Sequence, residues 1–142
     1  MLFRSEDRVQ PGRGFPMHPH HDLEIVMLPR LGAVDHLDSE GRQMQVQPGE
    51  LQWMRAGRGI IHSEMPEQQD GLMEGFQLWV NLPAALKMSE PGWRDIPGNE
   101  VPEFVSEAGV MVRVVAGSCH GVSGAVVEGP VDPLFQIGRA HV

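Results

Sequence analysis

The sequence predicts an all-β domain, and three observations favour this fold class. Seventeen glycines and 12 prolines among 142 residues supply many turns, which disfavours a helical bundle. Short apolar runs recur roughly every 8–12 residues between these turns, a spacing typical of a β-sandwich or barrel. Hydrophobic residues make up 41% and charged residues 21% of the chain, which suits one globular domain and argues against disorder.

Strands are expected at each apolar run, in order along the chain. The expected strands are Leu23–Leu28, Ala33–Leu37, Gln43–Val46, Leu51–Met54, Ile60–Met65, Phe76–Val80, Val110–Val115 and Val122–Val127. Asp38–Gly41 joins two of them as a hairpin turn, because glycine tolerates a positive φ. Pro29 removes a backbone donor, so the first strand is expected to lie at a sheet edge or to be broken there.

One domain is expected over residues 1–136. The segment 87–102 holds Pro91, Pro97 and Pro102 and is predicted to be a linker-like loop. The histidine motif that begins at residue 18 leaves little room for strands before it. Ile137–Val142 resembles one reading frame of a common sequencing adapter. It is expected to be a non-native tail and is set aside from the fold.

Charge and cysteine content limit the functions open to the chain. The formal net charge is −8 with a pI near 5.2, which disfavours binding to nucleic acid through its phosphates. Cys119 is the only cysteine, so an intramolecular disulfide and a cysteine metal cluster are both excluded, and a reducing compartment fits. No apolar run approaches the roughly 20 residues of a membrane helix. We therefore expect a cytoplasmic protein without direct contact to nucleic acid or membrane.

Two short histidine motifs predict a metal site. His18 and His20 flank a proline at the first strand region, and His62 and Glu64 flank a serine on a later strand. Residues i and i+2 of a strand face the same side, so two facing strands would bring these four side chains together. Three imidazoles and one carboxylate suit iron, manganese, nickel or copper, and the lack of cysteine ligands argues against structural zinc. Four ligands on an octahedral ion leave two positions for water, dioxygen or substrate.

The remaining candidates near this site are weaker. Glu24 follows His20 by four residues, so strict alternation would make it an extra ligand or an acceptor that orients a histidine. His21 would point to the opposite face and is not counted as a ligand. His36 is expected at the surface. Trp53 and Trp79 could line a pocket, although aromatic side chains of this kind more often belong to the core.

Four sequence runs carry a resemblance to a known family. They are Gly14–His20, Pro48–Met54, Gln77–Pro83 and, as the most specific, Ala56–Pro66 with the sequence AGRGIIHSEMP. On these runs the chain resembles the pirin family of the cupin superfamily. The resemblance implies a cupin-type double-stranded β-helix, or jelly-roll, barrel. It also implies a fragment of a protein of about twice this length, covering most of the N-terminal barrel without its first strands and without the second barrel.

The same resemblance implies a ligand set and an activity. Iron(II) would be held by His18, His20, His62 and Glu64, with manganese, nickel, copper and cobalt as alternatives and Glu24 outside the ligand set. The leading expectation is a metal-dependent dioxygenase resembling quercetin 2,3-dioxygenase, which opens flavonol rings with dioxygen. In it the carboxylate of Glu64 also acts as the catalytic base for the flavonol hydroxyl.

Two other functions stay open from the sequence. One is a non-enzymatic iron-binding regulator, similar to a transcription cofactor, that acts through a protein partner. The other is a metal-binding relic with no further role. The pocket mouth, expected around Arg30, Met54 and Trp79, distinguishes the dioxygenase from the regulator. An open apolar mouth favours catalysis, whereas a plugged one favours regulation.

Overall fold

A computed structural model describes residues 2–67, 71–127 and 129–139 of the chain. The chain divides into two compact units, Met1–Asp95 and Ile96–Val142. This division falls inside the segment 87–102 that the sequence predicted to be linker-like, while the expected single domain over 1–136 stays a prediction. Within the described residues, no helix has the length and apolar character needed to cross a membrane.

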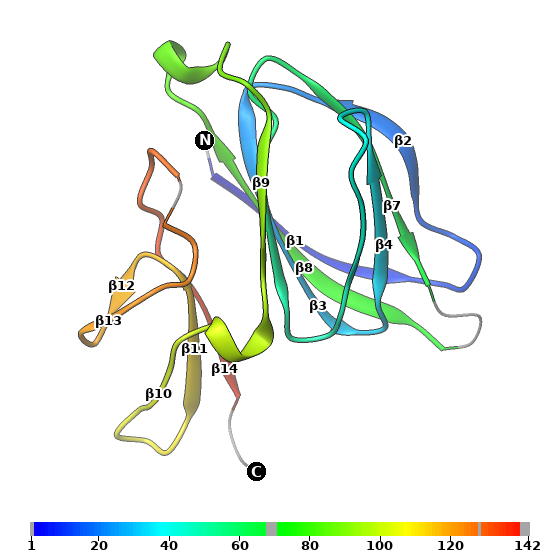
Figure 1. The fold of residues 1–142 in the computed structure, drawn as a ribbon. Coiled ribbons are helices and arrows are strands. Elements are labelled where there is room, and N and C mark those ends of the chain that lie inside the picture. The colour runs from blue at the N-terminus through cyan, green and yellow to red at the C-terminus, as the bar shows by residue number, and fades with distance from the viewer. Residues whose placement is uncertain (1, 68–70, 128, 140–142) are drawn as a thin grey trace. The chain divides into compact units, whose positions relative to one another are not determined.

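The first unit is built from two β-sheets (Figure 1). The five-stranded sheet has the order β1 (Leu2–Val9), β8 (Met73–Asn81), β3 (Leu23–Leu31), β6 (Leu51–Arg55) and β9 (Gly92–Ile96). The four-stranded sheet has the order β2 (Phe15–His20), β7 (Ile60–Pro66), β4 (Val34–Asp38) and β5 (Gln43–Val46). From β1 to β8 the chain crosses from one sheet to the other at every connection except the hairpin between β4 and β5, and a short 3-10 turn, η1 (Ala84–Leu86), follows β8.

Apolar side chains from both sheets meet in the interior of this unit. Met27 and Met73 of the five-stranded sheet pack in one cluster with Val34 and Val46 of the four-stranded sheet. Strand β4 shows how the pattern arises, because its buried and exposed residues alternate strictly. A strand with this period presents every second side chain to the core. The same inward face therefore also carries the polar residues that build the candidate site.

In the first unit, β1 and β9 are strands that the sequence did not predict. Leu2–Val9 forms β1 and pairs antiparallel with β8 along its whole length, so the expectation of little room for strands before residue 18 was wrong. Its charged residues and edge position hide the strand from an analysis that searches for apolar runs. Gly92–Ile96 forms β9 inside the predicted loop.

Strand β3 also differs from its expectation. It continues through Pro29 to Leu31 and lies between β8 and β6, so the edge alternative was wrong. Pairing with β6 ends at Met27, and the register against β8 shifts between Pro29 and Leu31. This interruption of the pairing agrees with the other alternative, a strand broken at Pro29, and takes the form of a bulge.

The second unit holds a small sheet and a hairpin. Its strands are β10 (Glu103–Val105), β11 (Met111–Ala116) and β14 (Phe135–Arg139) in the sheet, with β12 (Ser118–Cys119) and β13 (Val122–Ser123) in the hairpin, after the turn η2 (Gly98–Glu100). The strand predicted over Val122–Val127 is thus much shorter than expected. Residues 137–139 of the expected tail pair with β11, and residues 140–142 lie outside the described residues.

Candidate metal centre

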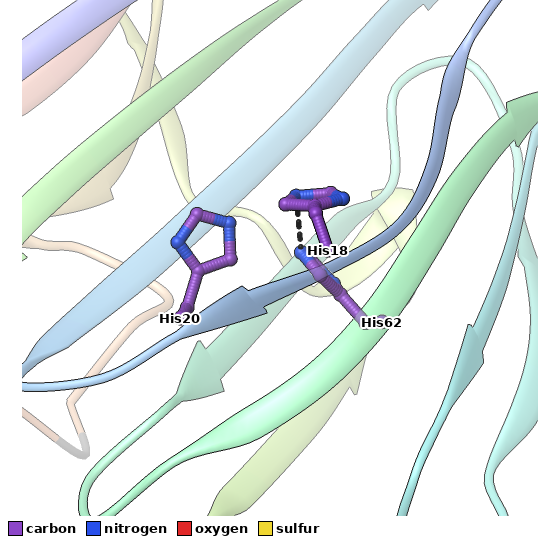
Figure 2. Close-up of side chains that lie close together, drawn as sticks. All are labelled: His18, His20 and His62. Carbon is purple, nitrogen blue, oxygen red and sulfur yellow. Dashed lines mark hydrogen bonds between the residues drawn. The ribbon is translucent and has the colours of Figure 1, made fainter.

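Strands β2 and β7 bring three histidines together. These strands pair antiparallel with His18 opposite His62, and the Nε2 atoms of the two rings lie 3.1 Å apart (Figure 2). The ring of His20, two residues further along β2, lies 4.8 Å from that of His18 and 5.0 Å from that of His62, measured between centroids. One nitrogen from each ring falls within 4.8 Å of the others. The predicted convergence of these three side chains is therefore seen in the fold.

Glu64 is buried and has a different set of neighbours from His18 and His20. It follows His62 by two residues on β7 and is only 3% exposed. A carboxylate oxygen of Glu64 groups with ring nitrogens of His62 and His36, all within 4.8 Å, rather than with His18 and His20. Its Oε2 accepts a 2.6 Å hydrogen bond from Nε2 of Gln77. His62 is thus shared by an outer cluster, His18, His20 and His62, and an inner cluster, His36, His62 and Glu64.

Burial sets the protonation of these side chains. Burial, together with the smaller effect of neighbouring histidines, lowers the pKa of His62 to about 3 and that of His20 to about 4. Burial also raises the pKa of Glu64 to about 7, against the opposing hydrogen bond from Gln77. The two imidazoles are therefore neutral at pH 7, which is the form that binds a metal.

The donor set fits a divalent first-row metal. Two Nε2 atoms only 3.1 Å apart are close to the spacing of neighbouring ligands around one ion, whose metal–nitrogen distances are about 2.1 Å. The imidazoles offer lone pairs, and the buried carboxyl adds the hard oxygen donor and the negative charge that such ions prefer. The chemistry of these side chains thus supports a metal, without specifying which one.

The turn that leads into β7 fixes the start of this strand, which carries His62 and Glu64. Gly57 has φ +53°, a conformation that favours glycine. A Cβ atom at this position would lie 2.2 Å from the carbonyl oxygen of Ser89. The neighbouring amide of Arg58 donates to that same oxygen at 2.9 Å. The AGRG run therefore anchors the start of β7 against the loop after η1.

The structure bears on two expectations about nearby residues. Glu24 is buried on β3, in the other sheet from His20, and it belongs to neither cluster, which agrees with its expected place outside the ligand set and argues against an extra ligand. Asp22, with φ +69°, lies between the two strands, so strict alternation does not carry from His20 to Glu24. His36 was expected at the surface but is 1% exposed. Its alternation with Val34 and Asp38 on β4 was the signal that could have placed it inside.

A cavity of about 290 Å³ adjoins the histidines. Its lining is Phe3, Ser5, Asp7, Phe15, His18, His20, Glu64, Gln77 and Trp79. Of the three residues expected at the pocket mouth, only Trp79 lines this cavity. Met54 belongs to a core cluster with Ile25, and the guanidinium of Arg30 lies 5.8 Å from the ring of Phe76. The volume falls at the lower end of the range for small-molecule sites.

Comparison with known proteins gives a consistent result. The sequence model of the family described as Pirin matches residues 1–80. A pirin-like protein of Caulobacter vibrioides is 49% identical over 123 residues, which make up 86% of this chain and 45% of that protein. The chain spans about half the length of the curated relatives it matches.

Solved structures show the same fold. A quercetin 2,3-dioxygenase from Acinetobacter baumannii matches with a TM-score of 0.78 and 33% identity, covering 90% of this chain and 48% of that one. A bacterial pirin from Escherichia coli, in complex with nickel(II), matches with a TM-score of 0.65 and 26% identity, covering 80% and 53% of the two chains. The all-β cupin fold expected from the sequence is confirmed.

Proposed function

The chain belongs to the pirin family, and from this premise we propose that its first unit is the metal centre of a dioxygenase that opens flavonol rings with dioxygen. The observation that carries the proposal is the cluster of His18, His20 and His62, of which His18 and His20 line a partly aromatic cavity. The relative from Acinetobacter baumannii that shares the fold is a quercetin 2,3-dioxygenase, which supports this substrate class.

In this proposal four side chains hold the metal. His18, His20 and His62 contribute imidazole nitrogens from β2 and β7, and Glu64 contributes its carboxylate from the buried side. When bound, a divalent ion supplies Lewis acidity and open coordination positions for oxygen chemistry. Iron(II) is the metal we propose, with manganese, nickel, copper and cobalt as alternatives. A relative with this fold was solved with nickel(II).

The other cavity residues would bind and orient the substrate. Phe3, Phe15 and Trp79 offer aromatic surfaces against which flavonol rings can stack. Ser5 and Asp7, joined by a 3.3 Å hydrogen bond, offer polar partners for substrate hydroxyls. The Glu64 carboxylate faces the same cavity and is the basic oxygen that would accept the proton of the flavonol hydroxyl.

Oxygen uptake tests this function. The purified protein, loaded in turn with iron(II), manganese(II) or nickel(II), is mixed with quercetin while dioxygen and flavonol absorbance are followed. We expect both to fall with at least one metal, and both losses to vanish in His62→Ala but not in His21→Ala, which changes an exposed ring outside both clusters. The proposal would be contradicted if neither this protein nor a full-length relative, each loaded with metal, consumed dioxygen with any flavonol.

A regulatory function is the second candidate, and one surface favours it. Met17, Leu37 and Ile61 are 53%, 44% and 47% exposed on β2, β4 and β7, the strands of the sheet that carries the histidines. A protein partner could cover these side chains. Binding of a partner that depends on the metal, in the absence of oxygen uptake, would select this function. The cytoplasmic location and the lack of nucleic-acid contact stay predictions.

A further inference from the structure

Strand β4, which pairs with β7 beside the proposed metal centre, carries two buried polar residues that are not among the proposed ligands. In the register of β4 and β7, Asp38 lies opposite His62 and His36 lies opposite Glu64. Each proposed ligand on β7 therefore has its own neighbour on β4. His36 is 1% exposed and Asp38 is 4% exposed. Burying such groups is unfavourable unless they are paired, so their position beside the ligands calls for an explanation.

A chain of contacts fixes the orientation of His36. The backbone amides of Glu40 and Arg42 donate to Oδ1 of Asp38, both at 3.0 Å. The other oxygen, Oδ2, accepts from Nε2 of His36 at 3.3 Å. The hairpin turn after β4 thus holds the carboxylate, and the carboxylate holds the imidazole. Because Nε2 then carries the proton of a neutral ring, Nδ1 of His36 keeps its lone pair.

That imidazole contacts the proposed ligands. The rings of His36 and His62 meet edge to face with centroids 5.2 Å apart, and a nitrogen of His36 lies within 4.8 Å of both His62 and Glu64. Within the described part of the chain, Nδ1 of His36 and Nδ1 of His62 are buried without a hydrogen-bond partner. The arrangement resembles the carboxylate–histidine pairs that commonly orient metal ligands.

We propose that His36, held by Asp38, is a positioning residue of the metal centre that fixes the His62 ring and the Glu64 carboxylate from the buried side. This inference rests on the proposed metal-binding function. It explains why His36 joins the inner cluster without joining the outer one. The edge-to-face packing of His36 against His62 limits rotation of the His62 ring and keeps its Nε2 directed toward His18.

Cobalt(II) binding tests the proposal in the whole chain. His36→Phe retains a ring and removes both nitrogens, and Asp38→Asn retains the shape of the acceptor while replacing one oxygen with a donor. We expect each variant to bind cobalt(II) 10- to 100-fold more weakly, the usual effect of losing such a partner. The visible spectrum at saturation should keep its wild-type form, because the ligands are unchanged. His21→Ala is the matched control and should bind as the wild type does.

A second readout separates positioning from a merely structural role. Long-range ¹H–¹⁵N spectra of the metal-free protein report which nitrogen of His36 carries the proton. We expect Nε2–H in the wild type, because Asp38 accepts from Nε2, and a mixture of tautomers in Asp38→Asn, at a temperature where thermal melts show both proteins fully folded. Wild-type affinity in both variants would overturn the inference, as would a saturated spectrum showing a lost ligand, which would make His36 a ligand instead. A wild-type protein that binds no cobalt(II) would overturn the proposed function itself.

Discussion

The carboxyl of Glu64 is buried where its ionised form is disfavoured. Its pKa is about 7, compared with an ordinary value of 4.5, chiefly because of burial. A raised carboxyl pKa means that the folded protein binds this proton more tightly than the unfolded chain does. Ionisation of Glu64 therefore lowers the free energy of unfolding of the metal-free protein as pH rises from about 4.5 to 7. The ionised carboxylate that would bind a metal thus destabilises the metal-free protein. Such a conflict between stability and function is typical of functional sites.

This conflict predicts opposite effects of Glu64→Gln on stability and on metal binding. In the metal-free protein at pH 8, the variant should be more stable than the wild type, by up to about 3 kcal/mol. The difference should shrink as pH falls toward 4.5, where the wild-type side chain is neutral in both states. Metal affinity should fall, because a neutral amide replaces the carboxylate. Urea unfolding with a chelator present measures the first effect, and metal titration measures the second.

Glu40→Gln is the matched control for this experiment, because Glu40 is exposed on the hairpin turn. Glu40→Gln should change neither the free energy of unfolding nor the metal affinity. A Glu64→Gln protein that is less stable than the wild type at pH 8 but not at pH 5 would contradict the assigned direction of the pKa shift.

Trp79 and Met54 have separate roles in the structure, although the sequence placed both at the pocket mouth. Trp79 lines the cavity, whereas Met54 is 2% exposed in the core. Trp79→Leu should weaken quercetin binding about tenfold, the equivalent of about 1.4 kcal/mol of lost ring contact. Met54→Ala should leave that affinity unchanged and reduce the free energy of unfolding by about 2–5 kcal/mol. Calorimetric titration measures quercetin affinity, and urea unfolding measures stability. Weaker quercetin binding in Met54→Ala with unchanged binding in Trp79→Leu would contradict the cavity lining.

Among the structural elements, β7 depends most directly on the turn before it. Gly57→Ala requires both a positive φ and a shift of the Ser89 carbonyl, so we expect a loss of about 3 kcal/mol or more in the free energy of unfolding. Gly41→Ala is the control, because its φ is +83° but no atom lies within 4 Å of the added Cβ. It should cost only about 1 kcal/mol. Equal losses in urea unfolding would show that the Ser89 contact is not restrictive.

The sequence predicted best the bounds of those strands that coincide with an apolar run between turn residues. β5 spans Gln43–Val46 as expected, and β6 and β7 extend the predicted ranges by one residue. β1 was missed because five of its eight residues are exposed and it pairs through its backbone. The central position of β3 was missed because a bulge, which local sequence does not indicate, accommodates Pro29.

At the scale of the whole molecule, the convergence of His18, His20 and His62 was predictable, because strand parity selects them and the two strands pair in register. The grouping of Glu64 with His36 was not, since it depends on the register of β4 with β7. The position of Glu24 was not predictable from alternation either, because the turn at Asp22 moves the chain to the other sheet. Pairing between distant strands is thus the information that periodicity along one strand lacks.

Metal content measures most directly whether His18, His20, His62 and Glu64 bind an ion. The wild-type protein, refolded with iron(II) and freed of excess metal, is measured by elemental mass spectrometry beside His62→Ala, Glu64→Ala and the control His21→Ala. We predict close to one divalent first-row ion per chain in the wild type and the control, and almost none in the other two. A full complement of metal in His62→Ala, or none in the folded wild type, would contradict the assignment of this site.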